Sequence, residues 1–195
     1  MKYCEKEGID LYVVFIDFKQ AFERVWRGGL LDKLWRMGIR GKLWRVIRDM
    51  LTNTKTYART NFGDTETWEV IDGIIQGSVL SAILFIVFIS HISEDLRHLS
   101  PTINGKEIVP QLFADDGTLY AIGDRACREI IEGCMKWAEK HNMVLNMSKS
   151  KALSLQGHER PLYDDEKHFE MVRHAILLGV GIDNKGVYST AYVRT

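Results

Sequence analysis

The hydrophobic and polar positions of this chain change period several times, which predicts a mixture of strands and helices. Residues 11–16 form a nearly continuous apolar run rich in β-branched and aromatic side chains, and the run ends at Asp17. This pattern is typical of a central strand that is covered on both faces. Apolar positions then recur at helical spacing over residues 30–35 and 43–51, with glycines between them. We therefore predict a buried strand followed by two amphipathic helices.

The rest of the pattern predicts short strands and one long helix. Residues 108–122 contain two apolar stretches interrupted by Asp115-Asp116-Gly117, which predicts a hairpin with carboxylates at its tip. Asn104-Gly105 is a tight-turn signal, and Asp124 is expected to cap a helix that ends near Asn142. The predicted apolar face of this helix consists of Cys127, Ile130, Ile131, Cys134 and Ala138. Further short strands are predicted at about residues 56–60, 67–71, 152–155 and 176–182. No internal repeat or break in composition marks a second domain.

One uncharged segment, residues 73–92, approaches the length of a transmembrane helix. Its unbroken apolar part is limited to residues 82–89, and polar residues such as Gln76 occupy its first half. The flanking charges are acidic, at Asp72 and Glu94, instead of the Lys and Arg that favour membrane anchoring. We therefore expect a buried helix preceded by a glycine-containing loop, and no contact with a membrane.

The composition is that of a globular domain without net charge. Of 195 residues, 46% are hydrophobic, and 26 Lys and Arg balance 26 Asp and Glu, which argues against a disordered tail and against a strongly basic nucleic-acid binder. The balance hides a charge dipole, because residues 1–60 carry 13 basic and 7 acidic side chains. The three cysteines have no CxxC spacing. They predict buried free thiols in a reducing, intracellular compartment, and neither a disulfide framework nor a zinc site.

Three carboxylates stand at the ends of predicted strands. Asp17 follows the buried strand, and Asp115 and Asp116 lie at the predicted hairpin tip, the first of them 98 residues later. Carboxylates at the end of a buried strand favour a cation, and a hairpin bend allows consecutive Asp side chains to converge. Paired Mg²⁺ ions about 4 Å apart suit such an arrangement. A solvated Asp-Asp-Gly turn is the simpler alternative for the hairpin taken by itself.

Five segments resemble, in order and spacing, the palm motifs of reverse transcriptases. They are residues 15–23 (FIDFKQAFE), 73–81 (GIIQGSVLS) and 112–116 (LFADD), then Leu145-Asn146 with Lys149-Ser150-Lys151, and Leu178-Gly179-Val180. The chain looks most like the enzymes of non-LTR (LINE-type) retrotransposons, over about residues 11–182. The resemblance implies an α+β polymerase palm, in which an antiparallel sheet carries catalytic carboxylates and helices pack on one face. It also implies an RNA-directed DNA polymerase, which adds dNTPs to the 3′-OH of a DNA primer on an RNA template.

The resemblance assigns metal binding and catalysis to four residues. Asp17 and Asp115 would hold two Mg²⁺ ions, for which Mn²⁺ is a substitute, and Asp116 would support them as a weaker ligand. Lys149 is the candidate for protonating pyrophosphate, because an ammonium near a leaving phosphate can act as a general acid. A surface lysine without a role in the reaction is the alternative.

The resemblance also implies contacts with the nucleotide and the primer. Phe22 matches the steric-gate position, where an aromatic ring excludes a 2′-OH, and core packing is its alternative. Gln76 and Gly77 would contact nucleotide and template, with glycine permitting close backbone approach, although a flexible loop before a helix has the same pattern. Leu178 and Gly179 resemble the region that positions the primer terminus, and a strand with a glycine bend is the alternative. The remaining substrate-binding candidates are Phe18, Phe113 and Ala114.

A basic segment runs from Arg24 to Arg59 and carries ten Lys and Arg against two acidic residues, with three tryptophans interleaved. Phosphate contacts of this kind give sequence-independent, salt-sensitive affinity for a template–primer duplex. The alternative is a solvated helix face with the tryptophans in the core. The nucleic-acid-binding candidates are Arg36, Arg40, Lys42, Arg45 and Arg48.

The chain departs from the family pattern in two residues and in extent. Glu23 replaces the usual second Asp of the first motif, and Ala82 replaces a Pro. The first change keeps a carboxylate, and the second removes a helix-start constraint. We expect residues 1–72 to form a fingers and palm portion and residues 73–182 the palm core, with the upstream fingers and the thumb missing. Because these parts position the substrates, the isolated chain is expected to polymerise weakly or not at all.

Three other functions stay open at this point. Another palm-fold nucleotidyl-transferring enzyme, such as a nucleotidyl cyclase, would carry a Gly-Gly-Asp/Glu signature where this chain has Phe113-Ala114. A phosphatase with an aspartyl nucleophile would need an Asp where Lys19 stands. A catalytically inactive reverse transcriptase remnant would fold and bind nucleic acid through the basic helices without polymerising.

Overall fold

The computed structural model describes residues 2–157, 162, 169–177, 180–183 and 188–189. The chain forms two compact units, and each unit has buried side chains of its own. Unit 1 comprises Met1–Lys19, His91–Lys140 and Val144–Thr195, and unit 2 comprises Gln20–Ser90 and His141–Met143. The predicted division at residue 72 concerns the subdomains of the family and stays a prediction.

Unit 1 is built on a five-stranded sheet with the order β11-β10-β1-β9-β8. Strand β1 (Leu11–Asp17) is central and pairs antiparallel with β9 (Asp116–Ile122) on one side and with β10 (Lys151–Ser154) on the other. The edge strands are β8 (Gln111–Phe113), antiparallel to β9, and β11 (Glu170–Met171), parallel to β10. The first six residues of β1 are buried, as its apolar run predicts.

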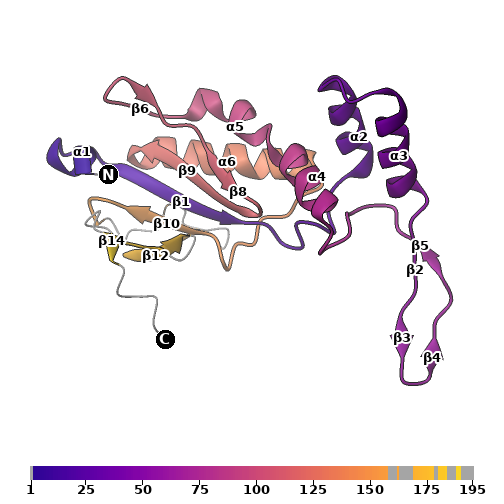
Figure 1. Cartoon of the computed structure of the whole chain (residues 1–195). Helices are drawn as coiled ribbons and strands as arrows, with labels where there is room; N and C mark the ends of the chain where they lie inside the picture. The colour runs from indigo at the N-terminus through magenta and orange to yellow at the C-terminus, as the bar shows by residue number, and fades with distance from the viewer. Residues whose placement is uncertain (1, 158–161, 163–168, 178–179, 184–187, 190–195) are drawn as a thin grey trace. The chain divides into compact units, whose positions relative to one another are not determined.

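One face of this sheet is covered by helix α6 (Gly123–Lys140), which packs on β1 and β9 along its predicted apolar face (Figure 1). The helix begins at Gly123, so Asp124 lies in the first turn and does not cap it, contrary to the prediction. The Asp124 carboxylate instead accepts a hydrogen bond from the hydroxyl of buried Tyr12 on β1. Burial and this bond raise the pKa of Tyr12 well above its ordinary value. The neutral phenol therefore ties the start of α6 to the central strand.

The opposite face is covered by a small antiparallel sheet of β12 (His174–Leu177), β13 (Val180–Asp183) and β14 (Tyr188–Ser189). Alternate residues of β1, together with Leu153 of β10, form a core with Ala175 and Ile182 of the small sheet. The prediction that helices pack on one face is therefore confirmed, and strands close the other face.

Short elements complete unit 1. Helix α1 (Lys2–Lys6) precedes β1, while α5 (Ile92–Asp95) and the 3₁₀ turn η1 (Arg97–Leu99) pack on α6. Strands β6 (Thr102–Ile103) and β7 (Lys106–Glu107) form the tight hairpin that the Asn-Gly pair predicts, and both turn residues have positive φ.

The three cysteines, Cys4, Cys127 and Cys134, are buried free thiols, as predicted. Burial raises the pKa of Cys127 and of Cys134 to about 12. Because the thiolate is the reactive form, these two thiols are inert at neutral pH and serve as small apolar core residues.

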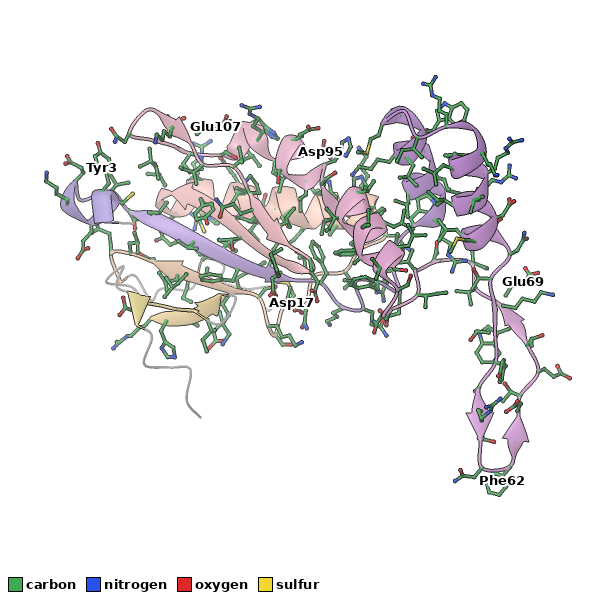
Figure 2. All side chains as sticks on the ribbon, in the orientation of Figure 1. Tyr3, Asp17, Phe62, Glu69, Asp95 and Glu107 are labelled. Carbon is green, nitrogen blue, oxygen red and sulfur yellow. The ribbon has the colours of Figure 1, made fainter. Side chains whose placement is uncertain are left out.

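Unit 2 consists of three helices and a long hairpin. Helix α2 (Arg27–Arg36) packs on both α3 (Gly41–Thr52) and α4 (Val79–Ile89). The hairpin contains two short ladders, which are β2 (Lys55–Thr56) with β5 (Trp68–Glu69) and β3 (Arg59–Thr60) with β4 (Gly63–Asp64). The strands predicted at about residues 56–60 and 67–71 are thus found in interrupted form, and Phe62 lies at the hairpin tip (Figure 2).

The helices of unit 2 are only partly covered. Of the predicted stripe on α3, Ile47 and Leu51 are buried, whereas Leu43 and Met50 are exposed. Helix α4 is apolar all around, with a buried side and an exposed side, and Val79 is 82% exposed. Among the residues that the structure describes, no helix has the length and apolar character needed to cross a membrane.

Candidate active site

Two of the predicted catalytic carboxylates face each other across neighbouring strands. Asp17 (Figure 2) ends β1 and Asp116 begins β9, and the strand register pairs these two residues. Directly opposed residues of an antiparallel pair point to the same face of the sheet, with Cβ atoms about 4.5–5.5 Å apart. The backbone therefore places these two carboxylates side by side.

The third carboxylate lies on the turn between β8 and β9. Phe113 pairs with Asp116, so Ala114 and Asp115 form the turn, and Asp116 and Gly117 belong to β9 instead of the predicted tip. Ala114 has a φ of 53°, a left-handed conformation that costs a residue with a Cβ about 1–2 kcal/mol. Strain of this kind persists where the surrounding structure holds the backbone. The turn brings Asp115 next to the Asp17–Asp116 pair.

Gly117 is required by packing, and not by a turn. It is buried opposite Ile16 on β1, and a Cβ at this position would lie 2.5 Å from Cγ1 of Ile16. Protein interiors are packed as densely as organic crystals, so a larger residue would force the strands apart. The glycine thus keeps β9 in register with β1 beside the carboxylates.

Two hydrogen bonds from the segment before β10 hold the backbone of Asp17. The Asp17 N–H donates to Oγ of Ser150 at 3.1 Å, and the Asn146 N–H donates to the Asp17 carbonyl at 2.8 Å. Ser150 is fully buried, so its hydroxyl supports the site from within the core. Sequence reasoning missed this role, although Ser150 lies inside the motif that contains Lys149.

The pKa of Asp116 shows that the charged residues are neighbours. It is raised above its ordinary value, first because protein atoms displace water from the carboxyl and then because the Asp115 and Asp17 carboxylates repel its charged form. Lys149 acts on the same pKa in the opposite direction. Charge effects of this kind act at short range. The strand register, the turn between β8 and β9, and the hydrogen bond from Asn146 to Asp17 bring together the segments that carry the four predicted catalytic residues.

The chemistry of these donors suits a hard divalent cation. Carboxylate oxygens are the protein ligands that Mg²⁺ prefers, and positive charge relieves the repulsion among neighbouring carboxylates. Within the described residues, no group of three or more His, Cys, Asp or Glu side chains is already gathered closely enough to hold a metal ion. Binding therefore requires these side chains to move closer together than they are in this structure.

In unit 2, the predicted nucleotide contacts lie on two segments. Phe22 is half-buried, and its ring stacks on Phe85 of α4 with the centroids 4.7 Å apart. Gln76 is exposed, and its Nε2 donates a hydrogen bond to Oε1 of Glu23 at 2.6 Å. Gly77 has a φ of +84° with open space around it. Its backbone conformation therefore favours glycine, a reason that differs from the predicted close approach.

The other substrate candidates differ in placement. Phe18 is 3% exposed and packs beside Trp137 in unit 1, with ring centroids 6.3 Å apart. Its side chain belongs to the core, so the predicted substrate contact of Phe18 is restricted to its backbone. Phe113 is 66% exposed next to the turn that bears Asp115. Leu178 and Gly179 lie outside the described residues.

The basic candidates lie on α2, on α3 and on the loop between them. The guanidinium of Arg40 lies 5.1 Å from the ring centroid of Trp35, and that of Arg48 lies 5.4 Å from the ring centroid of Trp44. The two indoles pack edge to face. Trp35 is 44% exposed, so the alternative that the tryptophans are core residues is wrong for this one.

Part of the positive charge on these helices is unneutralised. Two salt bridges, both 2.8 Å long, join Arg36 to Asp32 and Arg48 to Asp49. Lys42 and Arg45 are exposed, and within the part of the chain that the structure describes they form no salt bridge. We call the exposed surface formed by Arg36, Arg40, Lys42, Arg45 and Arg48 the basic face. It presents excess positive charge to an anionic partner.

Unit 1 has a largely antiparallel sheet with a helix on one face. One carboxylate ends its central strand, and two more lie at the adjoining hairpin turn. This is the architecture of a polymerase palm. The family model for reverse transcriptase (RNA-dependent DNA polymerase) matches residues 1–181. The chain therefore belongs to the reverse transcriptase family, and the resemblance carried by the sequence motifs is confirmed.

Relatives from mobile elements agree with the LINE-type resemblance. The chain is 24% identical over 186 residues to the RNA-directed DNA polymerase from mobile element jockey of Drosophila melanogaster. It is 25% identical over 186 residues to the probable RNA-directed DNA polymerase from transposon X-element of the same organism. Each match covers 90% of this chain and 20% of the relative, so the chain spans about a fifth of the length of these relatives.

Solved structures share the fold. The chain resembles telomerase from Candida tropicalis, solved in complex with a fragment of telomeric RNA, with a TM-score of 0.73 and 12% identity over 99% of this chain and 32% of that one. The corresponding complex from Candida albicans gives a TM-score of 0.72 and 12% identity over 100% of this chain and 32% of that one. At this identity the likeness concerns the fold, and it confirms the predicted α+β palm.

Proposed function

We propose that this chain forms the catalytic part of an RNA-directed DNA polymerase of a mobile element, which adds dNTPs to the 3′-OH of a DNA primer on an RNA template. The observation that carries the proposal is the register of β1 and β9, which pairs Asp17 with Asp116 next to the turn that bears Asp115. Membership in the reverse transcriptase family indicates the type of reaction.

Asp17 and Asp115 are the proposed ligands of two Mg²⁺ ions, with Asp116 as a weaker ligand, and Mn²⁺ is expected to replace Mg²⁺ at oxygen ligands. Reverse transcriptases generally use divalent metal ions. Such ions, when bound, lower the pKa of the attacking 3′-OH and neutralise the pyrophosphate leaving group. The hydrogen bond from the Asp17 N–H to Ser150 and the one from the Asn146 N–H to the Asp17 carbonyl keep the backbone of this proposed ligand in place.

Lys149 is the proposed proton donor to the pyrophosphate. Its charge opposes the rise in the pKa of Asp116, which supports a position of the ammonium near the carboxylates. A lysine in this position can give its proton to a phosphate oxygen as the bond to the leaving group breaks. The turn that carries Lys149 begins at Asn146, whose N–H is bonded to Asp17, so the positions of acid and metal ligand are coupled.

Phe22, Gln76 and Gly77 are the proposed nucleotide contacts of unit 2. Phe113 and Ala114 are proposed substrate contacts of unit 1. Phe22 suits a steric gate because its stacking on Phe85 keeps the ring from moving aside for a 2′-OH. The basic face is the proposed contact with the phosphates of the RNA template and the DNA primer. Leu178 and Gly179 are the proposed contacts with the primer terminus.

Primer extension tests the proposal. The chain alone and the chain completed with family fingers and thumb are supplied with a DNA primer on an RNA template, dNTPs and Mg²⁺. The completed enzyme is expected to extend the primer, and Asp115→Asn is expected to lower its rate by about a thousandfold, because metal-ion catalysis supplies several kcal/mol of transition-state stabilisation. The chain alone is expected to extend weakly or not at all.

Glu139→Gln is a matched control, because it neutralises an exposed carboxylate on α6 of the same unit. This variant is expected to extend primers at the parent rate. Equal rates for Asp115→Asn and its parent, or an inactive completed enzyme, would contradict the proposal. An inactive protein whose salt-dependent binding of primer–template is unchanged by Asp115→Asn would identify the chain as a non-catalytic remnant.

A further inference from the structure

Residues 22–25 and 73–76 of unit 2 carry the proposed nucleotide contacts Phe22 and Gln76, and hydrogen bonds join the two segments. We infer that Glu23 and Arg27 are positioning residues, which set the separation and orientation of Phe22 and Gln76 and thereby tune selection of the nucleotide sugar. The inference rests on the proposed function, because it takes Phe22 and Gln76 as the groups that contact the nucleotide.

The two segments are first joined through their backbones. The Gly73 N–H donates to the Val25 carbonyl and the Ile74 N–H donates to the Phe22 carbonyl, both at 2.8 Å. Gly73 is buried with a φ of +84°, and a Cβ there would lie 2.5 Å from the carbonyl oxygen of Glu23. The backbones are therefore in direct contact, and a displacement of residue 73 moves the segment that carries Gln76.

Arg27 holds the same segment from the side. Its side chain is 5% exposed, and its Nε donates to the Gly73 carbonyl at 2.6 Å. Its Nη1 donates to the carbonyls of Leu51 and Val70. One guanidinium thus ties together the end of α3, the end of the hairpin and residue 73. Only arginine offers enough donors in a fixed planar fork for this, and a lysine ammonium cannot reach the three carbonyls in the same geometry.

Glu23 fixes the orientation of the Gln76 amide. A carboxylate only accepts hydrogen bonds, so the group of Gln76 that faces Glu23 at 2.6 Å is the Nε2 donor. The carbonyl oxygen of the same amide is then directed away from Glu23 as an acceptor, which matches a hydroxyl donor on a nucleotide sugar. Hydrogen bonds to a charged group are stronger than those between neutral groups. A neutral residue at position 23 would let the amide rotate.

Phe22 forms the other side of this arrangement. Its ring is held by stacking on the fully buried Phe85, and its carbonyl accepts the hydrogen bond from Ile74. The ring and the Gln76 amide are therefore linked through one short path of backbone and side-chain bonds. The loss of Glu23 or Arg27 therefore changes the position of Gln76, while the ring of Phe22 remains stacked on Phe85 of α4.

Nuclear magnetic resonance of the ¹⁵N-labelled 195-residue chain tests the positioning directly. Glu23→Ala is expected to shift the side-chain NH₂ signals of Gln76 relative to the parent, because the Gln76 Nε2 then loses its carboxylate acceptor. Arg27→Lys is expected to speed hydrogen exchange at the Gly73 and Ile74 amides at least about tenfold, because local opening then costs less free energy. Glu69→Ala removes an exposed carboxylate of the same unit. It is expected to change neither the Gln76 signals nor the exchange rates of the Gly73 and Ile74 amides.

Calorimetric titration of the same proteins with dGTP and with GTP, in the presence of Mg²⁺, tests the consequence. Glu23→Ala is expected to lower the ratio of dGTP to GTP affinity by about tenfold or more, the size of effect that follows the loss of a hydrogen bond to a charged group. The double variant Glu23→Ala with Gln76→Ala is expected to have the same ratio of dGTP to GTP affinity as Gln76→Ala alone, because Glu23 acts through Gln76.

The outcomes separate this inference from the proposed function. A parent that binds dGTP no better than GTP would count against the proposed nucleotide site, while the Gln76 signals and the exchange rates would still decide whether the positioning exists. If the parent prefers dGTP over GTP and the variants Glu23→Ala and Arg27→Lys keep the same preference, the inference is overturned while the proposed function stands. Gln76 signals that are indifferent to Glu23→Ala would also overturn it.

Discussion

The carboxylate site of unit 1 and the basic face of unit 2 are both clusters of like charge, but they are assembled differently. Asp17 and Asp116 are far apart in sequence, and the pairing of two buried strands brings them together. The residues of the basic face lie within one stretch from Arg36 to Arg48 and project from helix surfaces and a loop. A cluster set by backbone pairing depends on the core beneath it, whereas a cluster of exposed side chains tolerates the loss of single members.

The two units also differ in how they bury apolar surface. Strand β1 is covered on both faces, by α6 and by a second sheet. Helices α3 and α4 leave part of their apolar residues exposed, and unit 2 relies on a few specific contacts, such as those of Arg27 and Gly73. We therefore expect unit 1 to be sensitive to cavities in its core, and unit 2 to be sensitive to changes at these contacts.

Gly73→Ala tests the dependence of unit 2 on one contact and should have the largest effect on stability. The new Cβ would lie 2.5 Å from the Glu23 carbonyl oxygen and would impose a strained positive φ. Together these effects are expected to lower the free energy of unfolding by about 2–6 kcal/mol. Gly77→Ala is the control, because Gly77 has the same φ of +84° and open space, and it is expected to cost about 1–3 kcal/mol. Equal urea-unfolding midpoints for the two variants would contradict this account.

Leu153→Ala tests the dependence of unit 1 on its core. Leu153 is fully buried between the two sheets, so truncation is expected to cost about 2–5 kcal/mol through lost burial and a cavity. Leu43→Ala removes the same side chain from α3, where it is 59% exposed, and is expected to change stability by less than about 0.5 kcal/mol. Chemical denaturation of both variants measures the difference between their losses of unfolding free energy. This difference would disappear if Leu43 packed as a core residue.

Asp116→Asn tests the repulsion within the carboxylate site. The pKa of Asp116 is raised in the folded chain, so protonation stabilises the fold below the ordinary aspartate pKa of about 3.9, and this stabilisation is lost as pH rises through the raised value. The asparagine side chain of the variant does not ionise, so the variant does not lose stability in this pH range. Without metal, its thermal midpoint is therefore expected to exceed that of the parent at neutral pH, and the difference is expected to vanish in acid. Mg²⁺ is expected to stabilise the parent more than the variant, and an identical response of both would argue against metal binding at this site.

Lys42→Ala and Arg45→Ala test the basic face and should have the smallest individual effects. Each is expected to reduce the dependence of primer–template binding on salt by about 0.9 in the slope of log K against log salt, the value for one phosphate contact. Fluorescence anisotropy at several salt concentrations measures this slope. Arg97→Ala is the control, because Arg97 is paired with Glu107 in unit 1 at 2.6 Å, and it is expected to leave the slope unchanged.

The elements with a strong period could be predicted from the sequence. The apolar run of β1 and the helical stripe of α6 identify a buried strand and a helix that covers it, and both are found. The predicted hairpin tip, Asp115-Asp116-Gly117, lies one to two residues beyond the observed turn of Ala114 and Asp115, because no sequence rule predicts that Ala114 takes a positive φ. The stripe on α3 was predicted only as the apolar face of an amphipathic helix. Periodicity does not tell how much of such a face is covered, and Leu43 and Met50 are exposed.

The candidate site also has a part that could be predicted from the sequence and a part that could not. The carboxylates and Lys149 lie in recognisable motifs, whereas the supporting contacts join residues that are distant in sequence. Ser150 reaches Asp17 across 133 positions, and Gln76 reaches Glu23 across 53. Side-chain hydrogen bonds of this kind have no periodic signal and follow only from the tertiary structure. Phe18 shows the converse, because it stands in a motif yet its side chain is buried beside Trp137.

The pairing of Asp17 with Asp116 also constrains how this gene can vary. Side chains alternate between the two faces of a strand, so a deletion or insertion of one residue between Leu11 and Asp17 would turn the carboxylate to the opposite face. Such a variant would still contain an apolar strand able to bury itself. Among natural copies of this sequence, a change in the length of β1 is therefore a sharper mark of lost activity than a conservative exchange of its apolar residues.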